Sequence, residues 1–133
     1  MTNTMNIEVR EAREAGLKAL RSLEKAREYL NSARSWGVFD ILGGGLISTL
    51  VKHAKMESAQ KCLEQAWYDL EYFRREVADV CLPGLDTGDF LTFADFFLDG
   101  FLADFMVQRR INETRQAVDE AIRHVEDVLR RLP

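Results

Sequence analysis

The sequence predicts an all-α protein: an antiparallel three-helix bundle of long, coiled-coil-like helices with a glycine-rich break after the first helix. Small and apolar residues recur at alternating steps of three and four along much of the chain, which places them on one seam of a helix. The chain has only two prolines, so few positions forbid a helix. Residues that interrupt helices gather in two segments, 35–45 and 82–89. These two breaks divide residues 1–133 into three helices of one domain.

The first helix is predicted over about 7–35. Its seam alternates alanine or glycine with leucine, and small residues let a neighbouring helix approach closely. The predicted break falls at Ser35 to Gly37 and at the three consecutive glycines Gly43 to Gly45. Three glycines in a helix cost roughly 3 kcal/mol relative to alanines, so a loop or sharp kink is expected there. The seam residues are Ala12, Gly16, Ala19, Leu23, Ala26, Leu30 and Ala33.

The second helix is predicted over about 46–81, with a seam that becomes bulkier toward its end. Trp67 is expected to anchor packing along one face of this helix, and Trp36 to do so at the preceding turn. The following segment, 82–89, contains a Pro-Gly pair and a second glycine, so it cannot continue the helix. The seam residues are Met56, Ala59, Leu63, Ala66, Leu70, Phe73, Val77 and Val80.

The third helix is predicted over 92–132, starting at a capping box formed by Thr92 and Asp95. At 1.5 Å per residue it would be roughly 60 Å long. Beside its seam, Glu126 precedes Arg130 by four residues and Asp127 precedes Arg131 by four, a spacing that supports ion pairs. Short connections between long helices imply antiparallel neighbours. The seam residues are Ile111, Thr114, Val118, Ala121, Val125, Val128 and Leu132.

Two segments, 36–56 and 91–111, align as diverged copies when one is shifted by 55 positions. Asp40 then matches Asp95, and Gly45 matches Gly100. Only two of the matches are identities, so chance similarity between helical segments is the alternative. The shared features, an aspartate, a glycine and an apolar stripe, are mostly what two helix starts require.

Composition excludes some classes of function. The net charge is −4 with both signs interleaved, whereas nucleic-acid binding calls for a clustered basic face. The N-terminus lacks the basic region and apolar run of a signal peptide, and no run of eighteen apolar residues predicts a membrane span. Cys62 and Cys81 lie several turns apart on the expected second helix, too distant from each other to form a disulfide. We therefore expect reduced thiols and a cytoplasmic protein.

The most unusual segment is the start of the expected third helix. Between Phe90 and Val107, thirteen of eighteen residues are apolar, including six of the eight phenylalanines. Asp95 and Asp99 share one helical face while Asp104 points roughly opposite, so no side is cleanly polar. Such a helix needs cover on more than one side, and a second copy of the chain would supply it. The predicted function is therefore protein–protein interaction as a homo-oligomer, most simply a homodimer.

In this interpretation the 36–45 segment of one copy packs against the phenylalanine-rich segment of the other. Asp99 and Asp104 would be costly among aromatic residues unless they are paired, and their expected partners are Lys52, Lys55, Arg109 and Arg110. The interface or binding candidates are Trp36, Phe39, Asp40, Gly43, Gly44, Gly45, Lys52, His53, Phe93, Asp95, Phe96, Phe97, Asp99, Phe101, Asp104 and Phe105.

A second hypothesis is a small-ligand or anion-binding protein, with an enzymatic role as one form of it. Bare backbone N–H groups at a helix N-terminus bind anions, and here Gly43 to Gly45 precede Lys52 and His53, with Asp40 nearby. No strand precedes the glycines, and no Lys-Ser/Thr follows at the P-loop spacing. A close-packed or flexible turn explains the glycines more simply. The ligand of such a site is not identified by the sequence.

Other chemistries find weaker support. A metal site could draw on Asp40, His53, Asp95 and Asp99, but the Glu-x-x-His pairs of carboxylate bundles are missing, so no metal or cofactor is expected. Peripheral membrane attachment through the phenylalanine-rich helix is a third hypothesis. It is disfavoured because membrane-surface helices segregate their charges and prefer lysine and arginine. No histidine lies beside either cysteine in sequence, and no nucleophile elbow is present, so the sequence favours a non-enzymatic protein.

The combined motifs resemble those of an uncharacterised family of bacterial all-helical proteins. The similar residues are the SWGxxD run at 35–40, the triple glycine with Lys52 and His53, and the FADFFxDG run at 93–100 with Asp104. The similarity covers about 26–118. It implies that the two segments belong together, and it carries no activity.

Overall fold

The structure is a computed structural model. It describes residues 3–41, 46–80, 82, 84–108 and 111–133, and the side chains at 6–32, 57–80, 82, 84–100 and 111–133. Over these residues the chain forms four helices and no strand: α1 (Asn3–Ile41), α2 (Leu46–Asp79), α3 (Gly88–Gln108) and α4 (Ile111–Arg131). The predicted all-α class is therefore confirmed.

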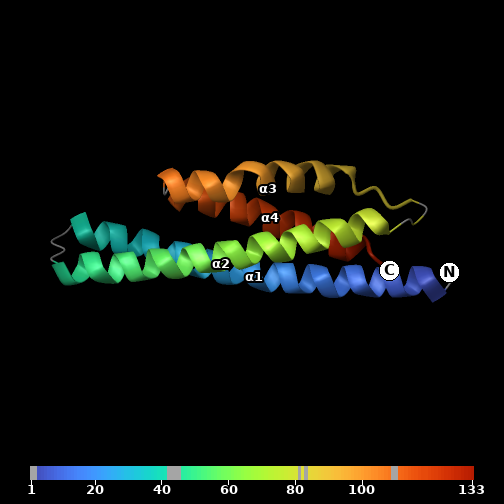
Figure 1. Ribbon diagram of the computed structural model, residues 1–133, viewed down its shortest axis with the longest axis horizontal. Coiled ribbons are helices and arrows are strands. Elements are labelled where there is room, and N and C mark those ends of the chain that lie inside the picture. The colour runs from blue at the N-terminus through green and yellow to red at the C-terminus, as the bar shows by residue number, and fades with distance from the viewer. Residues whose placement is uncertain (1–2, 42–45, 81, 83, 109–110) are drawn as a thin grey trace.

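The helices form two antiparallel hairpins that lie against each other (Figure 1). One hairpin pairs α1 with α2, and the other pairs α3 with α4. Helix α1 packs on α2 and α4, and α3 packs on the same two helices. Within the described part of the chain, α1 and α3 share no contact, so they occupy opposite corners of a four-helix cross-section.

The predicted third helix, 92–132, is corrected to two helices that fold back on each other. Helix α3 ends at Gln108 and α4 begins at Ile111. No glycine or proline lies between 101 and 132, so the local sequence does not signal a break. The physical reason is burial: Phe90 and Phe97 of α3 and Val125 of α4 lie in one core. A straight helix could not bring α3 and α4 together against α2.

The start of α3 also differs from the prediction. The helix begins at Gly88, and Thr87 acts as its N-cap because its carbonyl oxygen accepts a hydrogen bond from Leu91 N at 2.9 Å. The Asp86 side chain accepts a hydrogen bond from Gly88 N at 3.0 Å. In the preceding connection Gly84 has φ of 81°, a conformation that favours glycine. The predicted capping box of Thr92 and Asp95 therefore lies inside the helix.

Helix α1 continues past the predicted break at 35–37 and ends at Ile41. An isolated glycine costs a helix only about 1 kcal/mol, which a long packed helix tolerates at Gly37. The triple glycine itself lies outside the described residues. Helix α2 ends at Asp79, slightly before the predicted end at 81.

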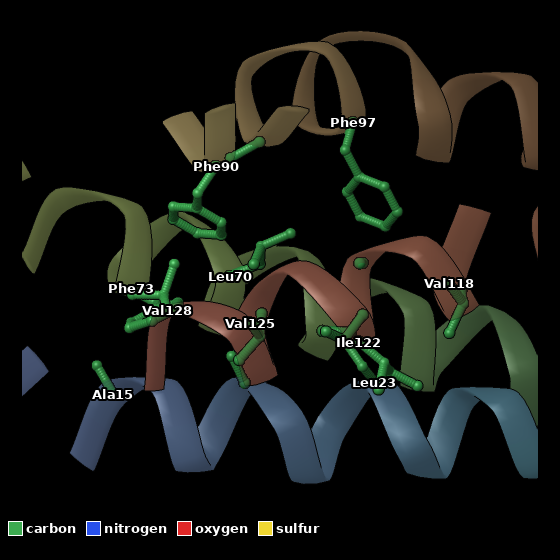
Figure 2. Packing of buried hydrophobic residues seen from close by; sticks show 14 of the residues in the cluster. Ala15, Leu23, Leu70, Phe73, Phe90, Phe97, Val118, Ile122, Val125 and Val128 are labelled. Atoms are coloured by element: carbon green, nitrogen blue, oxygen red, sulfur yellow. The ribbon is translucent and has the colours of Figure 1, made fainter. Parts of the chain in front are cut away.

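The core follows the predicted seams. Described seam residues of α1, α2 and α4 are buried, apart from the half-buried Val80 and Ile111 at two helix ends. Helix α3 adds Phe90, Ala94 and Phe97, and Figure 2 shows Phe90 and Phe97 pointing from α3 into the space beside α2 and α4. The largest fully buried side chains are Phe73, Leu23, Leu30, Leu63, Leu70, Val77, Val118 and Val125.

A first set of polar contacts joins α1 to α2. Asp69 of α2 is 6% exposed, accepts hydrogen bonds from Ser22 of α1 and from Gln65 (3.0 Å), and lies 3.7 Å from Lys18 Nζ. Hydrogen bonds to a buried carboxylate offset the loss of its hydration. These contacts tie α1 to α2 through a charge that would otherwise destabilise their interface.

The second set of polar contacts joins α4 to α1 and to its own last turn. Arg27 of α1 lies 3.4 Å from Asp119 of α4. Asp127 pairs with Arg131 at 3.2 Å, as predicted, and with Arg130 at 3.5 Å. Arg130 therefore pairs at a spacing of three with Asp127 rather than at four with Glu126.

The α1–α2 hairpin is longer than the α3–α4 hairpin and projects beyond it at one end (Figure 1). Arg27 of α1 lies opposite Asp119 of α4. Helix α4 begins about two turns before Asp119. Because α1 and α4 are antiparallel, the first residue of α4 lies opposite about residue 35 of α1. Trp67 of α2 contacts Leu98 of α3. Helix α3 continues for about three turns beyond Leu98. Because α2 and α3 are antiparallel, α3 ends opposite about residue 57 of α2. We call residues 36–41 and 46–56 the projecting hairpin end. It coincides with the helical parts of the first repeat-like segment.

Candidate functional site

Helix α3 presents an aromatic surface to solvent. The Phe96 side chain is 82% exposed. One turn earlier, the half-buried Phe93 stacks on the His124 ring of α4, with centroids 4.2 Å apart and planes 18° apart. We call Phe93, Phe96 and His124 the α3 aromatic surface. Exposed aromatic groups beside a half-buried ring pair are typical of protein interaction sites.

Charged residues of both signs border this surface. A shallow hollow of about 530 Å³ runs along α4 beside His124 and is lined by Glu120, Arg123, Asp127 and Arg130. An aromatic centre with a charged rim is the usual anatomy of a protein interface. The hollow is an open groove with mixed charge, so it shows no preference for an anion or a cation.

The phenylalanines of α3 divide between this surface and the core. Phe90 and Phe97 are each 3% exposed. Phe90 packs on Phe73 of α2 at a centroid distance of 5.2 Å, and Phe97 packs on Phe93 at 5.7 Å. Residues seven apart share a helical face, whereas Phe96 lies about 100° away from Phe97 around the helix axis. Phe97, predicted as an interface candidate, is therefore part of the monomer core.

Asp95 and Asp99, the predicted site aspartates of α3 whose side chains are described, lie on its solvent side. Asp95 pairs with Arg74 of α2 at 3.1 Å, and its side chain is 60% exposed. Asp99 is exposed, so its carboxylate keeps its hydration and needs no partner among the phenylalanines. The cationic side chains predicted to pair with it are not among the described side chains: Lys52, Lys55, Arg109 and Arg110.

Trp67 fixes the position of α3 on α2. Its indole Nε1–H donates a hydrogen bond to the carbonyl oxygen of Leu98 at 2.9 Å. The indole also packs edge-on against Tyr68, at 5.1 Å between centroids. Both contacts agree with the expected role of Trp67 as an anchor along a helix face.

Sequence reasoning missed two exposed tyrosines of α2, Tyr68 and Tyr72. The signal that could have found them is their spacing of four on a face opposite the seam. The Tyr72 hydroxyl donates a hydrogen bond to Glu76. The negative charge of Glu76 raises the pKa of Tyr72, and that hydrogen bond adds to the effect, followed by burial and by Glu11 and Glu14 of α1.

The environment of Cys62 does not favour a nucleophilic thiol. The thiol is half-buried, and this burial raises its pKa, while Lys25 acts in the opposite direction. A raised pKa lowers the fraction of reactive thiolate at neutral pH. Cys81 lies outside the described residues.

Several predicted site residues have helix positions but no described side chains. Trp36, Phe39 and Asp40 belong to α1, Lys52 and His53 to α2, and Phe101, Asp104 and Phe105 to α3, while Gly43, Gly44 and Gly45 lie wholly outside the described residues. Among the described side chains, no three of the His, Cys, Asp and Glu type come together as a metal site. No helix, over its described residues, combines the length and apolarity needed to cross a bilayer.

The fold and this surface define an all-helical protein of two packed hairpins with an exposed aromatic surface on α3. No family model, curated protein or solved structure matches the chain. The resemblance to a bacterial all-helical family therefore rests on its sequence motifs alone.

Proposed function

We propose that this protein is a non-enzymatic interaction protein that assembles as a homo-oligomer, most simply a homodimer. Its contact regions are the α3 aromatic surface and the projecting hairpin end. The observation that carries the proposal is the 82% exposure of Phe96 next to the Phe93–His124 stack. Burying one phenylalanine side chain contributes about 1.5–3 kcal/mol to the free energy of association or folding. The monomer does not obtain this stabilisation at Phe96, because that side chain stays exposed.

The composition of α3 supports an interaction role over a purely structural one. Helix α3 is the most apolar of the four described helices, although over the described residues it packs only on α2 and α4. A helix on the outside of a bundle needs one apolar stripe. Helix α3 has that stripe in Phe90 and Phe97, and Phe96 adds apolar surface on another side.

The test is the oligomeric state in sedimentation velocity with and without the change Phe96→Ser. We expect a wild-type dimer at tens of micromolar and a dissociation constant at least tenfold higher for the variant, because central aromatic residues dominate interface energies. Phe96 is exposed, so the circular dichroism spectrum and melting temperature should stay unchanged. Phe97→Ser is unsuitable, because it would damage the monomer core.

The matched control is Tyr68→Ser, which removes another exposed aromatic ring from the neighbouring helix. The Tyr68 side chain is 65% exposed, and its removal should leave the dissociation constant unchanged. A wild-type chain that stays monomeric at high micromolar concentration contradicts the proposed function. An equal loss of association in both variants contradicts the role of Phe96.

A further inference from the structure

We infer that Phe96 of each copy packs into the α4 hollow of the other copy, so that α3 of one chain lies over α4 of the second. This inference rests on the proposed self-association and names its geometry. The two copies would be related by a two-fold axis parallel to the helices. The α4 hollow is the open groove lined by Glu120, Arg123, His124, Asp127 and Arg130.

The first argument is that a projecting ring and a hollow adjoin on one face of the molecule. Phe96 is the most exposed of the large apolar side chains that the structure describes, at 82%. His124 lines the hollow and also stacks on Phe93, which lies one helical turn before Phe96. The hollow, of about 530 Å³, has room for a phenyl ring. Such a face can pair with a second copy of itself, because a two-fold axis lets each feature meet its complement twice.

The second argument is that the ring and the hollow match in height along the bundle. The Phe93–His124 stack fixes the register of the antiparallel helices α3 and α4. Counted from this stack, Phe96 lies at the height of about residue 121 of α4. A two-fold axis parallel to the helices leaves every residue at its own height. It therefore brings Phe96 of one copy beside Arg123 of the other, where a guanidinium group can lie over the aromatic ring.

The third argument is charge complementarity between α3 and the α4 hollow. Asp95 already pairs with Arg74, whereas Asp89 and Asp99 are exposed and form no ion pair among the described residues. The hollow contributes two exposed guanidinium groups. A contact between two copies of α3 would bring acidic groups together, whereas a contact of α3 with α4 brings them to arginines. The charged side chains that the structure describes on α3 are all acidic: Asp89, Asp95 and Asp99.

The same register identifies the ion pair that forms at one end of the contact. Asp89 lies at the height of about residue 128 of α4, so it faces Arg130 of the other copy. The Arg130 side chain is 72% exposed and lies 3.5 Å from Asp127 of its own chain. Asp127 also pairs with Arg131 at 3.2 Å. Arg130 can therefore turn to Asp89 without leaving Asp127 unpaired.

The remaining acidic residues do not oppose the contact. Asp99 lies at the height of about residue 118 of α4, next to Asp119, whose charge is already offset by Arg27 of the same chain. Glu120 lies three residues before Arg123, a spacing at which the two side chains can pair. Like-charge repulsion between the copies is therefore small over the described part of this face.

The size of the contact predicts a weak but specific dimer. Helices α3 and α4 have 21 residues each, which corresponds to a length of about 30 Å. Two neighbouring helices about 10 Å apart present a face roughly 20 Å wide. Such a face would bury roughly 600 Å² per copy and 1,200 Å² in total, at the lower limit of specific interfaces. We therefore expect dimers that exchange readily with monomers.

A charge exchange in the full-length chain tests the pair of Asp89 with Arg130. Asp89→Arg and Arg130→Asp should each raise the dissociation constant at least about fivefold in sedimentation velocity, because each variant places like charges opposite each other. The double variant restores opposite charges with the signs exchanged, so its dissociation constant should return to within about twofold of the wild-type value. Arg75→Asp is the matched control: this arginine of α2 is 67% exposed, and its reversal should leave the constant unchanged.

Cross-linking between two different chains gives the second measurement. With Cys62 and Cys81 replaced by serine, a Thr92→Cys chain is mixed with an Asp127→Cys chain. Thr92 lies at the height of about residue 125 of α4, so a short bismaleimide should join the two chains into mixed dimers. A Thr92→Cys chain mixed with an Arg75→Cys chain should give none. If a charge variant unfolds in circular dichroism, the cross-link decides.

The outcomes separate the inference from the proposed function. A dimer that Phe96→Ser weakens, but that neither charge reversal weakens and that does not cross-link between Thr92 and Asp127 positions, overturns this geometry and leaves self-association intact. Two weakened single variants whose combination stays weak overturn the pairing of Asp89 with Arg130. A wild-type chain that stays monomeric overturns both the inference and the proposed function.

Discussion

At the scale of the residue, Gly16 shows how closely the helices approach each other. A Cβ atom on Gly16 would lie 2.7 Å from Leu129 Cδ2 of α4 and 2.8 Å from Phe73 Cε1 of α2. Both distances are far below van der Waals contact. Gly16 therefore lies at a point where α1, α2 and α4 meet, and a larger residue would force the Leu129 and Phe73 side chains to move.

The first prediction concerns this close approach. Gly16→Ala should lower the free energy of unfolding by about 1 kcal/mol, because overpacking costs about 1–3 kcal/mol while alanine favours the helix by about 1 kcal/mol. Gly100→Ala is the matched control: among the described residues no atom lies within 4 Å of its added Cβ, so it should stabilise the chain. Urea denaturation measures both. An increase in stability for both variants would contradict the close packing at Gly16.

A second residue-scale prediction concerns Tyr72. Its phenol should ionise at a higher pH than free tyrosine, because the Glu76 carboxylate repels the phenolate and accepts the hydrogen bond of the neutral form. Glu76→Gln removes the charge and should lower the pKa of Tyr72 toward the ordinary value of about 10. Ultraviolet difference titration, with Tyr72→Phe to assign the signal, measures the shift. An unchanged titration in Glu76→Gln would show that Glu76 has no such effect.

At the scale of the element, α3 is the least predictable helix from local sequence. Its start is set by the hydrogen bonds that the Asp86 side chain and the Thr87 carbonyl accept, and these residues precede the predicted capping box. Its position is set by contacts from α2, through the Trp67 hydrogen bond and the Arg74–Asp95 ion pair. The ion pair is exposed and contributes little. The indole contact is the more specific anchor.

The element-scale prediction follows from that anchor. Trp67→Phe keeps an aromatic ring but removes the hydrogen bond to Leu98, which should lower the free energy of unfolding by about 1 kcal/mol. Hydrogen exchange should become faster in α3 than in α1, because α3 loses one of its attachments to α2. Tyr68→Phe, at the neighbouring exposed ring, should change neither quantity. Uniformly faster exchange across all helices would indicate global destabilisation instead.

At the scale of the whole molecule, two hairpins of unequal length are packed together (Figure 1). The longer hairpin leaves its projecting end beyond the shorter one, and the shorter hairpin leaves Phe96 on its outer side. The two motif segments therefore occupy different structural settings. Segment 36–56 spans the end of α1 and the start of α2, whereas 91–108 is continuous helix.

The candidate site was partly predictable from sequence. The abundance of phenylalanine in α3 indicated an unusual surface, and Phe96 is exposed as an interface residue must be. Phe97 was assigned to the same surface, but it lies in the core, because composition does not reveal which side of a helix meets its neighbours. The contribution of His124 was missed, since Phe93 and His124 lie far apart in the sequence and meet only in the folded chain.

The sequence by itself determined the helical class and the seams of α1, α2 and α4, because the steps of three and four between small and apolar residues reflect the period of the helix itself. Tertiary structure alone decided that residues 92–132 fold back as two helices, and which phenylalanines of α3 turn inward. Those outcomes depend on burial between helices distant in sequence. No local residue pattern records the free energy that such burial contributes.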